Sequence, residues 1–276
     1  MTGASSLTIL RSASGKPQAK HHTRLATGTL TSTKIATETL WRHARIEVAN
    51  IYELAHKLKR LADDELAVVM RDDPAPHVDT SRPIYRRKGE CIDVARCWAM
   101  LDIDDLVAPH LDVVEEPELA AHFIRDELAT YAPELEGVAM FVAWSGSCGI
   151  RDRSTLKAHV WLMLDRPLAG GELKRWARAV NARAARKLID ESIFDRVHIH
   201  FNARPSCVGF PDPFAGDRRF VLLRGEPAAS PVVPAFNAPS PRAASGGDAP
   251  IGEARGFEAR LARIGAGGVN AEAMAA

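Results

Sequence analysis

The chain has 276 residues, of which 46% are hydrophobic and 26% are charged. This is ordinary globular composition, and the length allows one large domain or two smaller ones with a real core. The formal net charge of +1 neither indicates nor excludes a polyanionic partner, because a balanced total can hide local basic clusters.

Cysteine usage and hydropathy bear on the location of the protein. The four cysteines lack the Cys-x-x-Cys spacing of a structural zinc site, which favours reduced thiols in a cytoplasm. The chain contains no run of 18 or more apolar residues and no apolar leader at its start. We therefore expect a cytoplasmic protein with no membrane partner.

The first 40 residues are rich in serine, threonine and small residues, which predicts an arm that is frayed or forms short strands such as residues 6–10. Its pair His21-His22 is a candidate metal site, although solvated histidines are the commoner case. Apolar residues at helical spacing then predict one or two helices over residues 37–67. The main domain, residues 41–226, is expected to begin with this helical part, residues 41–70.

Beyond this point strands alternate with helices. Helices are expected over residues 117–128 and 170–188. The second of these has a basic face, which can lie along a nucleic-acid backbone but is at least as often simply solvated. Apolar runs predict six strands, over residues 68–71, 97–105, 138–144, 157–164, 197–201 and 219–223.

The strand over residues 97–105 ends in carboxylates at alternate positions. Because side chains on a strand alternate between faces, Asp102 and Asp104 project to the same side and Ile103 to the other. Two like charges this close usually persist where a divalent cation or a shared proton offsets their repulsion. The alternative is that both carboxylates mark the exit of the strand into solvent.

Two further stretches carry groups that suit phosphates. Residues 145–149 form a Ser/Gly turn directly after a strand, and its exposed N–H groups can approach a phosphate closely. On the next strand, alternation places Lys157, His159 and Trp161 on one face, an unusual combination for a strand of the core. Carboxylates that hold divalent cations and cationic groups that hold a triphosphate are what nucleotidyl transfer requires.

In this order the motifs resemble those of the archaeo-eukaryotic primase superfamily, and within it the primase-polymerase modules of phage and mobile-element replication proteins. The first family motif, an apolar strand ending in Asp-x-Asp, matches residues 100–104. The second, a histidine on a strand, matches Lys157-Ala158-His159, with lysine where serine is usual. The third, an acidic residue after an apolar one, matches Ile189-Asp190. A Trp-Ser-x-Ser-x-Gly-Ile loop at residues 144–150 also fits, and the resemblance covers residues 90–225 well.

The resemblance implies an α+β fold, a primase-polymerase catalytic core with an RNA-recognition-motif-like, mostly antiparallel sheet flanked by helices. It also implies that Asp102, Asp104 and Asp190 bind the catalytic Mg²⁺ or Mn²⁺, with Asp195 left open as the alternative third carboxylate. His159 would contact the phosphates of the incoming nucleotide. From charge and position we add three helpers to the triphosphate, namely Ser147, Arg153 and Lys157.

The function that the resemblance implies is primer synthesis or chain extension from nucleoside triphosphates on a single-stranded DNA template, in phage or mobile-element replication. A replicative helicase, as a further domain or as a partner, fits this role. Residues 227–250, rich in Pro, Ala, Ser and Gly, predict a flexible linker. Residues 251–276 are expected to start a C-terminal helical segment.

Two other functions stay open. The His-hydrophobe-His form of His198 and His200 resembles HUH-type replication-initiator and relaxase nucleases, in which two histidines hold a metal and a tyrosine attacks DNA. Such a tyrosine would have to be Tyr52, Tyr85 or Tyr131. The other alternative is a degenerate primase-like module that binds single-stranded DNA without incorporating nucleotides, an interpretation that the lysine at position 157 favours.

Overall fold

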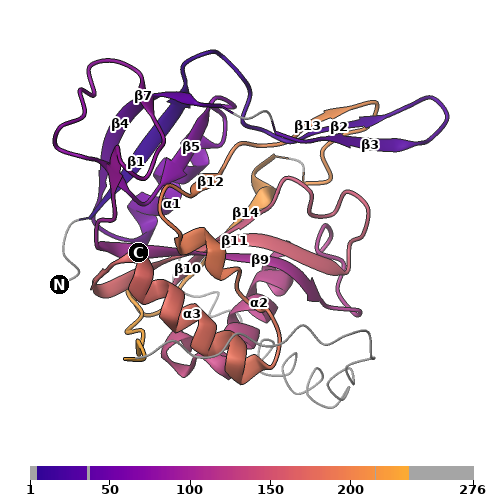
Figure 1. Cartoon of the computed structure of the whole chain (residues 1–276). Coiled ribbons are helices and arrows are strands. Elements are labelled where there is room, and N and C mark those ends of the chain that lie inside the picture. Colours follow the sequence, from indigo (N-terminus) through magenta and orange to yellow (C-terminus); the bar gives the residue numbers. More distant parts are fainter. Residues whose placement is uncertain (1–4, 36–37, 215, 236–276) are drawn as a thin grey trace, which may run out of the picture.

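Two antiparallel sheets make up most of the computed structural model, which describes residues 5–35, 38–214 and 216–235 (Figure 1). The four-stranded sheet has, in spatial order, β14 (Phe220–Leu223), β10 (Met140–Trp144), β11 (Thr155–Leu168) and β9 (Arg96–Val107). The five-stranded sheet has β12 (Ile199–Phe201), β5 (Ala67–Met70), β1 (Ser5–Ser12), β4 (Leu40–Val48) and β7 (Ile84–Tyr85).

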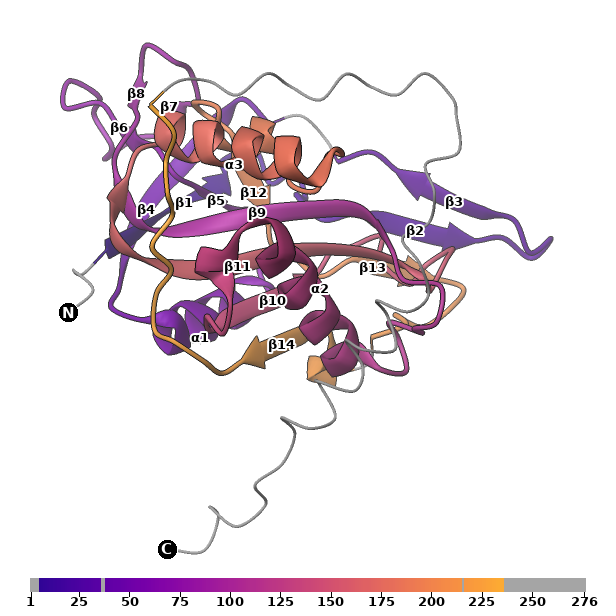
Figure 2. The ribbon, with the colours of Figure 1, turned by 90° about the horizontal axis from the view of Figure 1, so that it is seen from below.

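Helices cover both faces of the four-stranded sheet. α2 (Pro117–Tyr131) and α3 (Gly170–Ala184) lie on one face, and α1 (Ile51–Leu61) lies on the other (Figure 1, Figure 2). Along the chain the sheet and its two long helices follow a strand-helix-strand-strand-helix-strand succession, with β9 at a sheet edge. The predicted α+β class, with mostly antiparallel sheets flanked by helices, is confirmed.

Smaller elements complete the fold. A three-stranded ribbon projects from the body (Figure 1) and consists of β13 (Ser206–Val208), β2 (His21–Arg24) and β3 (Leu30–Thr33). The remaining elements are β6 (Asp73–Pro74), β8 (Cys91–Ile92) and the 3-10 helices η1 (Pro133–Leu135), η2 (Glu191–Phe194) and η3 (Gly216–Arg219). Within the described ranges, no helix is long and apolar enough to cross a membrane.

The strand expected over residues 6–10 is confirmed as β1, whereas the frayed arm is wrong, because β1 lies in the middle of the five-stranded sheet. It pairs with β4 over its whole length and with β5 on its other side. Its serines and threonine, which suggested a frayed arm, are buried, and the guanidinium of Arg96 donates to the hydroxyls of Ser6 and Thr8. A polar strand is stable here because the buried cation satisfies its hydroxyls.

The helical part predicted over residues 41–70 is wrong for its first third. Residues 40–48 form β4, and α1 begins only at Ile51. Asn50 has extended backbone angles, and its side chain accepts hydrogen bonds from the N–H groups of Tyr52 and Glu53 at 3.0 and 2.9 Å. Pairing with β1 therefore prevailed over the helical spacing, and Asn50 sets the helix start.

The six strands and two long helices predicted from apolar runs are all present. α3 ends at Ala184, before the expected residue 188, because Ala185 adopts a left-handed φ of 52°. Four of the six basic residues of this segment form ion pairs within the chain, whereas Arg175 and Arg183 donate to the backbone carbonyls of Pro234 and Tyr131. The ion pairs join Lys174 to Asp195, Arg178 to Glu191, Arg186 to Glu127 and Lys187 to Asp190.

The predicted linker is wrong for its first residues. Ala229 is buried, its N–H donates to the carbonyl of Met163, and its own carbonyl accepts from Asp165, both at 2.9 Å. The segment therefore docks beside β11. The rest of the expected linker, and the expected helical segment at residues 251–276, lie outside the described residues.

The buried carboxylate of Glu38 links β1 to β4 and makes stability depend on pH. Burial by itself would raise its pKa, but hydrogen bonds from the Ser12 and Ser14 hydroxyls and from the N–H groups of Thr39 and Leu40 lower the pKa to about 2. A carboxylate whose pKa falls on folding stabilises the protein above its unfolded pKa, and this contribution is lost as the pH falls through the folded pKa.

We expect Glu38→Gln to lower the free energy of unfolding at pH 7 by up to about 3 kcal/mol. The difference from the wild type should shrink as the pH falls from about 4.5 to about 2. Urea denaturation across this pH range measures it. Glu47→Gln is the matched control, because the Glu47 side chain is 64% exposed. An equal effect of both substitutions would contradict the assignment.

Candidate metal and nucleotide site

Three carboxylates meet at the edge of the four-stranded sheet. Asp102 and Asp104 come from β9, and Asp190 directly precedes η2. One oxygen of each carboxylate lies within 4.8 Å of the others. The backbone N–H of Asp190 donates to the carbonyl of Asp102 at 3.0 Å, so the third carboxylate is tied to the strand that carries the first two.

A β-bulge in β9 turns neighbouring carboxylates to the same side. In the pairing with β11, Leu106 lies opposite Leu156 and Ile103 opposite Ala158, so Asp104 and Asp105 together face Lys157. The ammonium group of Lys157 contacts Asp105 at 2.8 Å, while Asp104 stays with Asp102. Bulges re-aim side chains in this way, whereas strict alternation would send Asp104 and Asp105 to opposite faces.

The structure decides which residue is the third carboxylate. Asp195, the alternative, forms an ion pair with Lys174 of α3 and is not in the cluster. Asp190 is held by the Ser192 N–H at 3.0 Å and by Lys187 at 3.1 Å. Burial acts to raise the pKa of Asp190, but these hydrogen bonds and the charge of Lys187 outweigh it and lower the pKa.

The cluster concentrates negative charge that a cation would relieve. Burial raises the pKa of Asp102 to about 7, and repulsion from Asp104 and Asp190 adds to the shift. Three carboxylates are a suitable oxygen donor set for Mg²⁺ or Mn²⁺. The residues present therefore fit a divalent cation, as the motif predicted.

His159 lies across from the carboxylates. It is opposite Asp102 in the strand register, and its Nε2 is 3.7 Å from an Asp102 oxygen. Burial, helped by the charge of Lys20, lowers the pKa of His159 to about 4 and outweighs the pull of Asp104 and of a hydrogen bond to the Phe201 backbone. The imidazole is therefore neutral at pH 7.

The His198/His200 pair does not join this cluster. His200 is 2% exposed and lies edge-on to the rings of Trp98 and Trp161, with centroids 6.3 and 5.8 Å away. Burial drives the pKa of His200 well below its usual value. In the part of the chain that the structure describes, the group of side chains able to hold a metal is the aspartate cluster, without either histidine.

His22 is also not a solvated residue, contrary to the commoner case. Its side chain is buried, and its two ring nitrogens are within 2.8 Å of the Ser32 hydroxyl and of the Gly146 carbonyl. His22 therefore joins the ribbon to the Ser/Gly turn at residues 145–149. Arg219 holds that turn by donating hydrogen bonds to the carbonyls of Trp144 and Ser145 at 3.1 and 2.9 Å.

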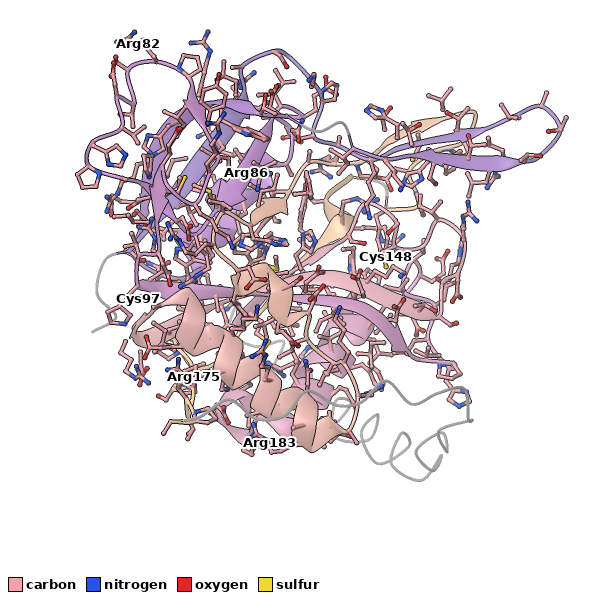
Figure 3. All side chains as sticks on the ribbon, in the orientation of Figure 1. Arg82, Arg86, Cys97, Cys148, Arg175 and Arg183 are labelled. Atoms are coloured by element: carbon pink, nitrogen blue, oxygen red, sulfur yellow. The ribbon has the colours of Figure 1, made fainter. Side chains whose placement is uncertain are left out.

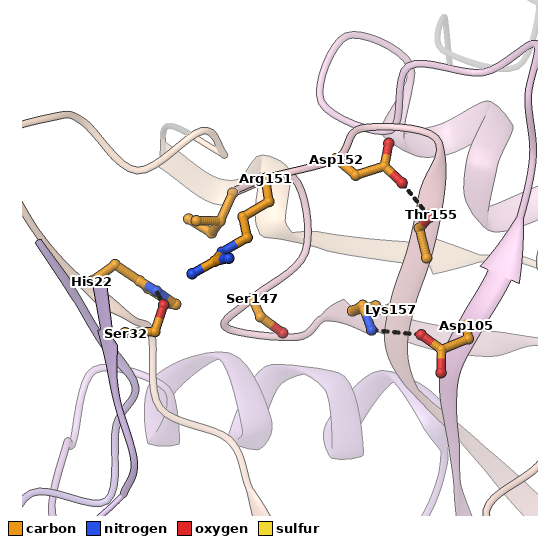
Figure 4. Close-up of a pocket in the computed structure, with 9 residues that line it drawn as sticks. His22, Ser32, Asp105, Ser147, Arg151, Asp152, Thr155 and Lys157 are labelled. Carbon is orange, nitrogen blue, oxygen red and sulfur yellow. Dashed lines mark hydrogen bonds and ion pairs between the residues drawn. The ribbon is translucent and has the colours of Figure 1, made fainter. Parts of the chain in front are cut away.

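A pocket of about 370 Å³ lies between the ribbon and the loop that joins β10 to β11 (Figure 4). It contains two of the predicted phosphate helpers, Ser147 and Lys157. Arg153 does not line the pocket, and its guanidinium pairs with Asp112 at 3.1 Å and with Glu115 at 3.3 Å. The residues that line the pocket are His22, Ser32, Asp105, Ser147, Ile150, Arg151, Asp152, Thr155 and Lys157.

Sequence reasoning missed Lys20. Its ammonium donates to the Ser147 hydroxyl at 3.1 Å, and both Asp102 and Asp104 act on its charge. Burial lowers the pKa of Lys20 despite these carboxylates. Nothing local in the sequence signals this role, because only the pairing of the N-terminal strands brings residue 20 to β9.

Comparisons with protein-family models, with curated proteins and with solved structures found no match to this chain. Function is therefore inferred from the chemistry of the site.

We expect Mn²⁺ to bind at the cluster and to raise the melting temperature of the wild type, because a bound cation offsets the repulsion among the carboxylates. Asp102→Asn and Asp190→Asn should abolish the Mn²⁺-induced rise, and Asp195→Asn should keep it. Thermal denaturation with and without Mn²⁺, together with titration calorimetry, measures both effects. A response lost equally in Asp195→Asn would argue against Asp190 as the third ligand.

Proposed function

We propose that the protein is a metal-dependent nucleotidyltransferase of the primase-polymerase kind, which starts or extends a chain on a single-stranded DNA template. The convergence of Asp102, Asp104 and Asp190, with His159 across from them, is the observation that carries this proposal. Replication of a phage or mobile element is the proposed setting, supported by the resemblance of the motifs.

The distribution of charge supports a nucleoside triphosphate as the substrate. The three carboxylates of the cluster lie together, and both Asp102 and Asp104 act on the charge of Lys20, which donates to the Ser147 hydroxyl. Lys157 lines the pocket beside Ser147 and pairs with Asp105. Phosphoryl-transfer sites combine carboxylates and cations in this way, because the phosphates need cations while the divalent ions need oxygen ligands. We assign the phosphate chain to the side of Lys20 and Lys157.

The reaction joins a 3′-hydroxyl oxygen, whose proton passes to water, to the α-phosphorus while the bond from that phosphorus to pyrophosphate breaks. Mg²⁺ or Mn²⁺ held by Asp102, Asp104 and Asp190 would supply Lewis-acid stabilisation of the attacking and leaving oxygens. The neutral imidazole of His159 donates a hydrogen bond to a phosphate oxygen. Lys20 and Lys157 stabilise the negative charge that the departing pyrophosphate carries.

The position of the Lys157 side chain weighs against the alternative of a degenerate module that binds DNA without incorporating nucleotides. The side chain that replaces the family's usual serine pairs with Asp105, outside the cluster, and so leaves Asp102, Asp104 and Asp190 available for a cation. The burial of His200 weighs against the nuclease alternative, because a metal held by His198 and His200 would need both rings to be accessible.

We expect the wild type to extend a labelled primer on single-stranded DNA with Mn²⁺, and Asp102→Ala to lower kcat by at least about 100-fold. Asp195→Ala, which removes a nearby carboxylate outside the cluster, should retain activity. Undiminished extension by Asp102→Ala would exclude this mechanism. A covalent protein–DNA adduct that is lost in Tyr52→Phe would instead favour the nuclease alternative.

Lys20→Ala should lower kcat/KM for the nucleotide by about 10- to 100-fold, because it removes a charge-assisted contact to phosphate. Arg153→Ala removes a cation that is turned to Asp112 and Glu115, and it should leave these constants unchanged. Steady-state extension with varied nucleotide concentration separates the two. Equal effects of both substitutions would contradict the placement of the triphosphate.

A further inference from the structure

The ribbon β13-β2-β3 contributes His22 and Ser32 to the pocket, but most of it extends beyond the site (Figure 1, Figure 2). We propose that this ribbon is the surface along which single-stranded nucleic acid lies as it reaches the carboxylate cluster. The assignment of that strand as the template rests on the proposed function. Binding of the strand to the ribbon can be measured without catalysis.

The N-terminal segment that includes β2 and β3 carries basic residues and no acidic ones. Residues 1–37 contain no aspartate or glutamate, although the chain has 35 acidic residues. The two strands of the hairpin and their flanks carry Lys20, Arg24 and Lys34, and most of the other side chains on the strands are threonine, serine or histidine. Cations and hydroxyls without carboxylates are the groups that bind a phosphate backbone.

The ribbon is continuous with the proposed nucleotide site. Its base is joined to the Ser/Gly turn by His22 at Gly146 and by Lys20 at Ser147. Further out, the guanidinium of Arg151, which lines the pocket, donates to the Leu30 carbonyl at 3.4 Å. Arg24 is paired with Leu30 in the hairpin, so a line of cations runs from Lys20 past Arg151 to Arg24. A strand rises about 3.3 Å per residue, so Lys20 and Arg24 are about 13 Å apart.

The outer end of this line combines a cation with an aromatic ring. The guanidinium of exposed Arg24 lies 4.7 Å from the centroid of the Phe210 ring. Gly209 (φ +80°) fixes this arrangement, because a Cβ there would come within 2.4 Å of the Arg24 carbonyl oxygen. Aromatic rings that stack on bases beside cations that bind phosphates are typical of surfaces for single strands.

Acidic neighbours of the ribbon are already engaged. Asp105 contacts Lys157, Asp152 accepts hydrogen bonds from Ser154 and Thr155, and Asp212 pairs with Arg219. The charges of Asp105 and Asp212 are therefore offset by cations of the protein, whereas Asp152 accepts from neutral donors and keeps its charge. A protein partner would find few apolar side chains here, since Leu25 and Val208 are the large exposed ones among the described residues of the ribbon and its turn.

The test measures binding of a fluorescein-labelled oligothymidylate to the full chain by fluorescence anisotropy, in EDTA so that the carboxylate cluster holds no metal. Arg24→Glu and the double variant Arg24→Glu/Lys34→Glu should weaken binding by at least about 10-fold at low salt and reduce its salt dependence. Arg82→Glu is the matched control: this side chain is 82% exposed and lies on the opposite side of the body from the ribbon (Figure 3). Circular dichroism verifies that all variants fold.

Loss in the ribbon variants with binding retained in Arg82→Glu supports the inference. Unchanged binding in the ribbon variants, equal loss in Arg82→Glu, or no binding by the wild type overturns it, and the first of these results would point to a protein partner for the ribbon. The assay in EDTA needs neither a bound metal nor a nucleotide. The ribbon assignment can therefore stand or fall independently of nucleotide incorporation.

Discussion

The site depends on one backbone hydrogen bond, from the N–H of Asp190 to the carbonyl of Asp102. β9 is an edge strand of its sheet, so its outer side is open to a segment that is not part of the sheet. The segment that follows α3 uses this opening, and it brings a third carboxylate to two that already repel each other. Burial raises the pKa of Asp102 to about 7, and repulsion from Asp104 and Asp190 adds to the shift.

Buried arginines hold β9 firmly enough for this arrangement. Arg96, at the start of β9, donates to Thr8 of β1 at 3.1 Å and to Asp73 at 2.6 Å. Arg71 follows β5 and donates to the carbonyls of Trp98 and Leu168, which belong to the four-stranded sheet. These contacts join the two sheets, so the N-terminal strand that leads to Lys20 and the strand that carries the carboxylates form one framework.

The face of the four-stranded sheet next to the site is apolar at one end and polar further along. At one end of this face, Trp98 of β9 and Trp161 of β11 pack against each other next to His200, with their ring centroids 5.5 Å apart. A few residues further along each strand, Asp102 and His159 face each other across the same pair of strands. The apolar part provides a rigid base, and the pocket between the Ser/Gly turn and the ribbon is lined mostly by polar and charged side chains (Figure 4). Rigid packing next to an open polar edge is what a site for a charged substrate needs.

The sequence by itself determined the elements whose signals are local. The apolar runs located six of the strands, and alternation placed Asp102 and Asp104 on one side. The motif order indicated His159 and Asp190 as partners. Tertiary structure decided the rest, because it depends on pairing between segments that are remote in the chain. Pairing with β1 made a strand of residues 40–48, the bulge turned Asp105 to Lys157, and surface acids drew Arg153 away from the pocket. Lys20 and the ribbon reach the site only through long-range contacts, which no local pattern of residues encodes.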